Sequence, residues 1–209
     1  MLIEAAVESA DAALAAVEGG AHRLELCADL AHGGVTPALA LPRVPIPVCV
    51  LIRPRAGDFV YSDGEHRLML EQIRQAKAAG ARGIVTGALT PAGAVDAPRT
   101  RELIAAARPL AVTFHRAIDL CASLETALET IIGLGADRVL TSGGARTAAE
   151  GADTIGRLVR QAAGRIVILA GGGIDATNVA RLVRESAMPE IHFSVTTAAK
   201  VRAVLHALA

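Results

Sequence analysis

The chain has 209 residues, with 21 basic and 21 acidic side chains, and 52% of its residues are hydrophobic. This length and apolar content fit one globular domain with a large core, and they exclude general disorder. The balanced charge and the scarcity of aromatic residues exclude a nucleic-acid-binding protein, which needs a basic surface and aromatic rings on which bases stack.

The longest apolar stretches, such as residues 44–52, are about half as long as the roughly 18 residues that a membrane span requires. The first residues, from Met1 to Glu4, lack the basic start and the apolar segment of a secretory signal. The three widely spaced cysteines form neither a disulfide framework nor a zinc signature. We therefore expect a cytoplasmic protein that does not bind a membrane.

Short runs rich in Val, Ile and Leu alternate with Ala-rich helical runs along the whole chain. The short runs lack strict alternation of polar and apolar residues, which is typical of strands buried on both faces. The predicted strands are residues 2–7, 23–27, 47–53, 83–88, 111–116, 138–142, 166–170 and 190–194.

Helical patterns separate most of these strands, and polar residues that cap helices mark where they begin. The first two predicted helices cover residues 10–18, capped by Ser9, and residues 66–79. The remaining predicted caps are Asp96 (with Pro98 in the first turn), Ser123, Asp175, and Thr196 or Thr197.

Three Gly-Ala pairs, at residues 20–21, 80–81 and 135–136, each end a predicted helix just before a predicted strand. Strands and helices that alternate in this way, with no low-complexity linker, predict a single α/β domain over residues 1–209, a (β/α)8 TIM barrel. An open doubly wound sheet is the alternative. Three prolines between residues 33 and 45 oppose a helix there, so we predict a minimal barrel with a shortened second βα unit.

In a parallel barrel, polar residues at the carboxyl ends of the strands face a common mouth, where active sites are built. Glu4 and Glu25 lie on neighbouring predicted strands, and we expect Arg53 and His115 to be their partners. Two crowded carboxylates raise one pKa, and a histidine titrates near neutrality, so this set predicts acid/base catalysis. A structural ion network is the alternative. Arg116 and Asp119, just after the fifth strand, complete the candidate catalytic set.

Two further groups are candidates for binding an anionic ligand. Arg55 lies two residues beyond Arg53, where a guanidinium can clamp a carboxylate or phosphate, or pair with Asp58 and Asp63 instead. The loops after strands six to eight hold the other candidates, because phosphate sites in barrels lie there and glycines let backbone N–H groups approach an anion. These candidates are Ser142, Gly143, Gly171, Gly172, Gly173 and His192.

Taken together, these residues make the chain resemble the CutC copper homeostasis family over nearly its whole length. The matching segments are residues 19–27, 33–37, 52–59, 61–63, 86–89, 112–119, 140–143 and 170–173. The resemblance implies a TIM barrel in the cytoplasm, a role in copper binding or copper tolerance, and a homodimer or homotetramer.

The resemblance also implies Cu(I) as a ligand, because members linked to Cu(I) carry one cysteine in a Glu-x-Cys segment of strand one and another in Glu-Leu-Cys of strand two. Here strand one reads Glu4-Ala5-Ala6, so Cys27 is the single candidate metal ligand of that pair. The alternative function is a TIM-barrel enzyme that performs acid/base or hydrolytic chemistry on a small polar substrate, phosphorylated or sugar-like. A mouth that serves stability alone is the third hypothesis.

Overall fold

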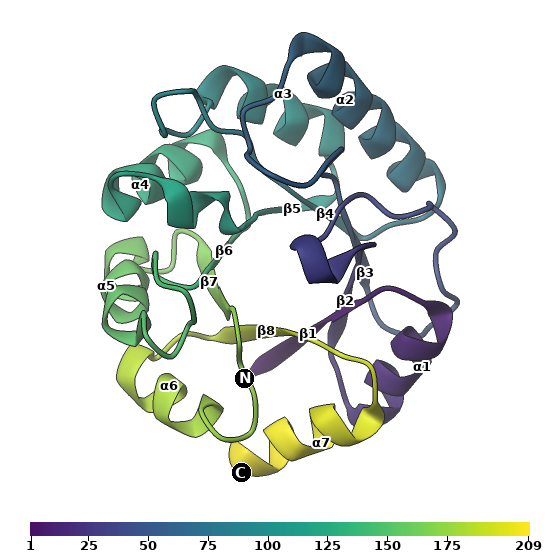
Figure 1. The fold of residues 1–209 in the computed structure, drawn as a ribbon, viewed down its shortest axis with the longest axis vertical. Coiled ribbons are helices and arrows are strands. Elements are labelled where there is room, and N and C mark those ends of the chain that lie inside the picture. The colour runs from purple at the N-terminus through teal and green to yellow at the C-terminus, as the bar shows by residue number, and fades with distance from the viewer.

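The computed structural model describes residues 1–209 as a closed barrel of parallel strands in the order β1 to β8, with β8 paired to β1 (Figure 1). The prediction of a (β/α)8 barrel is confirmed, and the open sheet is excluded. The strands are β1 Leu2–Val7, β2 Arg23–Leu26, β3 Val48–Leu51, β4 Gly83–Thr86, β5 Ala111–Phe114, β6 Arg138–Thr141, β7 Val167–Gly171 and β8 Glu190–Ser194.

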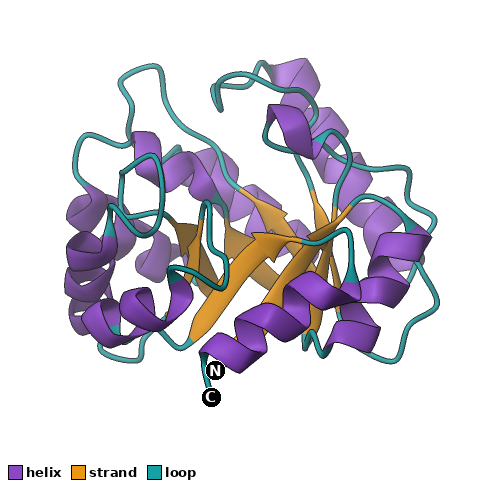
Figure 2. Cartoon of the chain, turned by 60° about the horizontal axis from the view of Figure 1, so that its bottom comes forward, coloured by secondary structure: helices purple, strands orange, loops and turns teal.

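Helices form a ring outside the strands (Figures 1 and 2). They are α1 Ala10–Gly19, α2 Asp63–Ala78, α3 Ala97–Ala107, α4 Leu124–Leu134, α5 Ala152–Ala162, α6 Val179–Ser186 and α7 Ala198–Ala207, with short 3₁₀ helices η1 Leu30–His32 and η2 Arg116–Leu120. Between β2 and β3 the chain forms only η1 and an extended segment, so the shortened second unit is confirmed. No helix is both long enough and apolar enough to cross a membrane.

Local sequence explains where most helices begin. The side chains of Ser9, Asp96 and Ser123 accept backbone hydrogen bonds at the starts of α1, α3 and α4, as predicted. Helix α2 begins three residues before the predicted start, because Ser62 and Glu65 form a capping box.

The predicted cap Asp175 is wrong. Helix α6 begins at Val179, and the Asp175 carboxylate instead accepts hydrogen bonds from the N–H and hydroxyl of Thr177. A loop residue that bonds to its own turn competes with helix formation. The Gly-Ala pairs end helices, or the turns that follow helices, as predicted. The glycines Gly20, Gly80 and Gly135 have left-handed φ angles of 97°, 91° and 81°, a conformation that favours glycine after the last helical turn.

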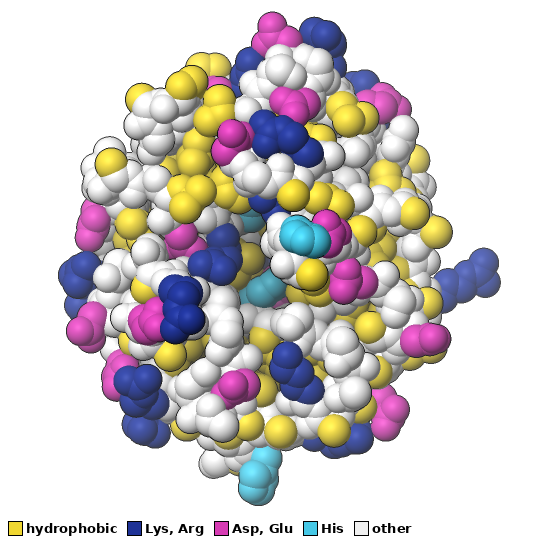
Figure 3. All heavy atoms as spheres, viewed as in Figure 1, with side chains coloured by type: hydrophobic (Ala, Val, Ile, Leu, Met, Phe, Trp, Pro, Cys, Tyr) yellow, Lys and Arg dark blue, Asp and Glu magenta, His cyan; other side chains and the backbone are white.

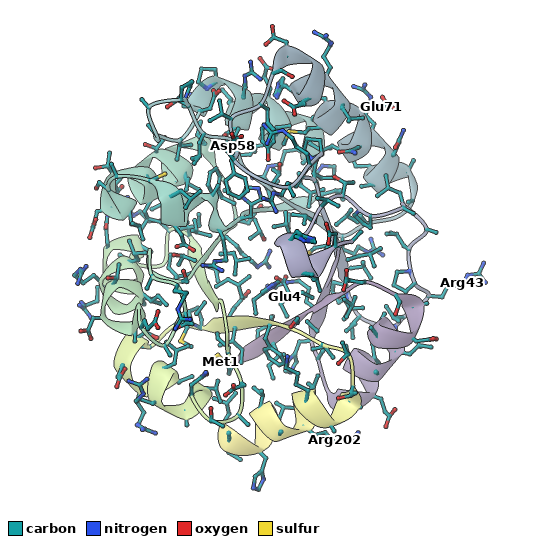
Figure 4. All side chains as sticks on the ribbon, viewed as in Figure 1. Met1, Glu4, Arg43, Asp58, Glu71 and Arg202 are labelled. Carbon is teal, nitrogen blue, oxygen red and sulfur yellow. The ribbon has the colours of Figure 1, made fainter.

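The two faces of the strands are chemically different. Along β1, Ile3, Ala5 and Val7 join a buried apolar layer between strands and helices, whereas Glu4 and Ala6 face the barrel interior. The register aligns Glu4 with Arg23 of β2 on one side and with His192 of β8 on the other. Figure 4 shows Glu4 near the centre of the ring of strands. The fold therefore brings charged side chains together on the barrel axis.

Candidate functional site

A chain of buried ion pairs crosses the barrel interior. The carboxylate of Glu4 accepts a hydrogen bond from Arg23 Nε and lies 2.9 Å from His192 Nδ1. The other end of the Arg23 guanidinium donates to Glu190, which also accepts from Arg138 Nε at 3.2 Å. All of these groups belong to strand residues that point inward, so each carboxylate has a cationic partner.

These contacts correct the partners predicted for Glu4 and Glu25. The structure pairs the two glutamates with Arg23 and His192, not with Arg53 and His115. Sequence reasoning missed Arg23, although a signal was present, because Arg23 and Glu25 are two residues apart and therefore share one face of β2. Glu190 and Arg138 were missed because they lie at the amino ends of their strands, away from the mouth.

Glu25 connects this network to the mouth. Its Oε2 lies 3.4 Å from His192 Nε2, and no protein group donates a hydrogen bond to its carboxylate. Burial raises the pKa of Glu25 to about 7, although the positive charge of His192 opposes this, and the charge of Glu4 adds to the increase. The pKa of one of the two carboxylates is thus raised, as the crowding of Glu4 and Glu25 predicts, but burial is the larger cause and the charge of Glu4 the smaller one.

The pKa values of both neighbours of Glu25, Glu4 and His192, shift in the direction that favours their charged forms. Burial alone would raise the pKa of Glu4, but the hydrogen bond and charge of His192, together with Arg23, lower it to about 2. Burial alone would lower the pKa of His192, but its hydrogen bond to Glu4 and the charges of both glutamates raise it. The Glu25 carboxyl, with a pKa of about 7, therefore lies beside an imidazole whose charged form is favoured, an arrangement that suits a general acid and base.

A cavity of about 100 Å³ lies above this pair at the carboxyl ends of the strands. Figure 3 shows histidine side chains deep in a hollow at the centre of this face, with basic side chains beside it. The polar lining of the cavity comprises Glu25, Cys27, Arg53, His115, Arg116 and His192. The structure thus brings Glu25, Arg53 and His115 to one cavity, although the three do not bond to one another.

Arg53 holds the loops that frame the cavity. Its guanidinium donates to the carbonyls of Gly33 and Gly34, at 3.0 and 2.7 Å, and to the carbonyl of Gly57 at 2.8 Å. The guanidinium carbon also lies 4.7 Å from the centre of the Phe59 ring. Of the three guanidinium nitrogens of Arg53, only the buried Nε has no hydrogen-bond partner in the protein.

His115 is held uncharged, which corrects the prediction that it titrates near neutrality. Its ring is buried, and burial together with the positive charge of Arg53 lowers its pKa to about 3. Its Nδ1 accepts a hydrogen bond from the N–H of Ala117 at 3.3 Å, as the cap of η2. Its Nε2 is buried and has no protein partner.

Asp119 stabilises a loop and is not free for catalysis. Its carboxylate accepts hydrogen bonds from Arg116 Nε, the Thr141 hydroxyl, the Ser142 N–H and hydroxyl, and the Gly144 N–H. Arg116 also donates to the Ser142 hydroxyl at 2.7 Å. The side chain of Arg116 remains 41% exposed, so it is available to a ligand.

The glycine loop after β7 borders a second cavity of about 210 Å³ next to the first. The N–H groups of Gly172 and Gly173 donate to no protein acceptor, and both residues have left-handed φ angles, 113° and 69°. The Gly143 N–H is instead used by Thr141 Oγ1 at 2.8 Å. Arg116 and His192 line both cavities.

Arg55 does not reach either cavity. Its guanidinium bonds to Asp58 and Glu65 and to the carbonyl of Val60, and it lies 5.4 Å from the centre of the Tyr61 ring. The structure therefore supports the ion-pair alternative for Arg55, with Glu65 in place of the expected Asp63, which pairs with Arg99.

The residues present do not fit a Cu(I) site. Cu(I) prefers thiolate or thioether ligands. All three cysteines are free and buried, and burial raises the pKa of the Cys27 thiol, which donates to the Val7 carbonyl at 3.5 Å. One group of three side chains places its ligand atoms within 4.8 Å of one another, and it consists of Glu4, Glu25 and His192, with no sulfur.

Comparisons with known proteins agree on the family. The model of the CutC family matches residues 1–197. A family protein CutC of Xylella fastidiosa is 49% identical over 205 residues, which cover 96% of this chain and 77% of the relative. The copper homeostasis protein cutC homolog of Homo sapiens is 48% identical over 198 residues, covering 92% of this chain and 72% of the relative.

Solved structures give the same result. A CutC from Streptococcus agalactiae superposes with a TM-score of 0.86 at 31% identity, covering 92% of this chain and 97% of that chain. An aldolase superposes with a TM-score of 0.71, but at 15% identity this likeness shows the fold alone. The chain belongs to the CutC family.

Proposed function

We propose that this protein is an enzyme that performs acid/base chemistry on a small, polar, anionic substrate at the carboxyl mouth of the barrel. The observation that carries the proposal is Glu25, a buried carboxylate that faces a cavity and accepts no hydrogen bond from the protein. Leaving a carboxylate so poorly solvated is costly, and a raised pKa of this kind is characteristic of catalytic acids and bases.

The proton of Glu25 has a defined exchange partner. His192 lies 3.4 Å from Glu25, and its other ring nitrogen is fixed by Glu4 at 2.9 Å. Arg23 in turn holds Glu4 through a buried ion pair. This arrangement fixes the orientation of the imidazole, so that one ring nitrogen faces Glu25 and the cavity.

The charges around the cavity favour an anionic substrate. Arg53 and Arg116 both line it, and His115 offers a neutral N–H. The adjoining cavity adds the free N–H groups of Gly172 and Gly173 and the ammonium of Lys200. Backbone N–H groups and cationic side chains of this kind bind phosphate or carboxylate groups, so we assign the anionic part of the substrate to this second cavity.

We do not assign a Cu(I) function to this chain. Some relatives are named copper homeostasis proteins, but here Ala6 leaves Cys27 without a partner thiol on β1. Free cysteines support a reducing, cytoplasmic location, and the family resemblance supports a homodimer or homotetramer.

The test is turnover by the wild-type protein and the Glu25→Gln variant. A fixed panel of sugar phosphates and hydroxycarboxylates is incubated with each protein, and the ¹H NMR spectrum of each compound is followed. We expect one or more compounds to be converted, at a rate at least about 100-fold lower in Glu25→Gln. Glu71→Gln, a change on the exposed side of α2, is the matched control. Equal turnover by Glu25→Gln and wild type would contradict the proposal.

A further inference from the structure

The hydrogen bonds of His115 determine which of its ring nitrogens carries the proton. Nδ1 accepts from the Ala117 N–H, so in the neutral ring the proton lies on Nε2. The centre of the His115 ring lies 4.6 Å from that of Phe59 and 5.9 Å from that of Phe114, and these two contacts limit the freedom of the ring to turn. His115 therefore presents a fixed, neutral N–H donor to the cavity.

A second donor is left free beside His115. Arg53 Nε–H is buried without a partner, and both Arg53 and His115 line the cavity that Glu25 enters. Buried donors without an acceptor are rare and destabilising, which points to an acceptor supplied by a ligand. The residues that line the cavity thus include two with an unpaired buried donor, Arg53 and His115, and one carboxylate that is able to take a proton, Glu25.

Neither Cys27, which lines the cavity, nor the nearby Ser142 is an activated nucleophile. The Ser142 hydroxyl bonds to Asp119 and to the Ala145 carbonyl, and the Cys27 thiol donates to a backbone carbonyl. An acyl- or glycosyl-transfer mechanism through a serine or cysteine is therefore not supported by the geometry.

We propose that the enzyme removes a proton from a carbon atom next to a carbonyl group, with Glu25 as the base and with His115 Nε2–H and Arg53 Nε–H as the donors to the carbonyl oxygen. This inference rests on the proposed function and names its reaction class. The C–H bond breaks as the proton forms an O–H bond with Glu25, and the electron pair moves to the carbonyl oxygen as an enolate. Return of the proton to the same or the neighbouring carbon completes an exchange or an isomerisation.

A neutral imidazole suits this role. Donors aimed at the oxygen on which charge develops stabilise the transition state strongly in a site that excludes water. The positive charge of Arg53 beside His115 disfavours an imidazolium, and it favours a negative charge on the ligand oxygen. The substrate class is a small hydroxy-aldehyde or hydroxy-ketone, whose anionic group lies toward Gly172 and Gly173 in the adjoining cavity.

The state of His115 is tested on the wild-type protein without any substrate. Two-bond ¹H–¹⁵N NMR correlations identify which ring nitrogen is protonated. We expect a neutral His115 protonated on Nε2 throughout pH 5 to 8. An imidazolium in that interval, or a ring protonated on Nδ1, would overturn the inference even if the enzyme is active.

The reaction class is tested by exchange in D₂O. Dihydroxyacetone, ribulose and their phosphate esters are incubated with the protein, and loss of the ¹H signal beside the carbonyl is measured. We expect enzyme-dependent exchange, faster for the phosphate esters, that falls at least about 100-fold in Glu25→Gln and in His115→Phe. His115→Gln, which keeps a neutral N–H donor, should retain more exchange than His115→Phe, and His206→Gln on the surface should match wild type.

The outcomes separate the two proposals. Exchange that depends on Glu25 supports both. Glu25-dependent turnover of another kind, without exchange at carbon, refutes the enolisation and leaves the proposed function standing. Absence of exchange with all four compounds counts against enolisation, and equal exchange in wild type and His115→Phe refutes the role of His115.

Discussion

The two faces of the barrel strands are built from opposite chemistry. The outer face, toward the helices, belongs to a cluster of 50 buried apolar residues. The apolar cluster on the inner face has only five, Ala6, Cys27, Cys49, Leu51 and Val85. TIM-barrel interiors are commonly filled with bulky branched side chains. In this protein, ion pairs occupy much of that space.

The two faces of the strands make different contributions to the protein. Burial of apolar surface on the outer face drives folding without directional requirements. Buried charges on the inner face add little net stability, but each charge needs its partner. The chain of ion pairs ends in Glu25, the one carboxylate of that chain without a hydrogen-bond donor, and this is the feature on which the proposed catalytic role rests.

The largest change in the free energy of unfolding is expected when the buried chain of ion pairs loses the cation at its centre, Arg23. Arg23→Met leaves Glu4 without its arginine and removes one of the two partners of Glu190, at positions where all the side chains are buried. We expect the free energy of unfolding to fall by about 3–5 kcal/mol, as in other buried pairs that lose one partner. Urea denaturation at pH 7 measures the change.

Two control variants show how large the effect of Arg23→Met is in comparison with other changes. Leu128→Ala, on the outer apolar layer, should cost about 2–5 kcal/mol through loss of packing. Arg165→Met, which removes an exposed pair with Glu129, should leave the urea midpoint near that of wild type. A loss below about 1 kcal/mol in Arg23→Met would show that water solvates the interior charges, and would remove the contrast between the two faces.

The inner face should also make stability depend on pH. The pKa of Glu25 is raised to about 7, so the unfolded chain ionises first and stability is lost as pH rises from about 5 toward 7.5. At about 1.4 kcal/mol per pKa unit, this loss is roughly 3 kcal/mol. The raised pKa of His192 acts in the same direction, whereas Glu4, lowered to about 2, loses stability only in more acidic solution.

Urea denaturation at pH 5.5 and pH 7.5 tests this dependence. The Glu25→Gln variant should show a much smaller difference between the two pH values, with the remainder due to His192. The same pH dependence in wild type and variant would assign the titration to another group.

Substitution of Cys27 is expected to have only a small effect on the binding of Cu(I). In competition with a strong Cu(I) chelator, the protein should not retain one equivalent of Cu(I), because the one group of three side chains placed to hold a metal ion, Glu4, Glu25 and His192, contains no sulfur. Cys27→Ser should bind Cu(I) as weakly as wild type. Tight retention of one equivalent that Cys27→Ser abolishes would restore copper handling as the function.

The smallest effect on stability and turnover is expected for a substitution of Arg55, which lies outside both cavities. Arg55 pairs with two exposed carboxylates, and such pairs contribute little. Arg55→Ala should leave both the urea midpoint and the rate of turnover unchanged. A loss of turnover would return Arg55 to the substrate-binding set.

The fold was largely predictable because short Val- and Ile-rich runs, helix caps and glycines act locally. Their places on neighbouring predicted strands also predicted that Glu4 and Glu25 approach each other. The partners were not predictable from strand ends alone, because barrel stagger aligns Glu4 with Arg23 and His192 rather than with Arg53. The neutral state of His115 depends on burial and on the Ala117 N–H, which only the folded loop provides.

The proposed catalytic role requires that Glu25, a buried carboxyl at the edge of the cavity, titrates near neutrality. A ¹³C NMR titration of the Glu25 side-chain carboxyl measures this directly, with Glu25→Gln used to assign the signal. The structure predicts a midpoint of about 7. A midpoint of about 4.3, the ordinary value for glutamate, would contradict the account.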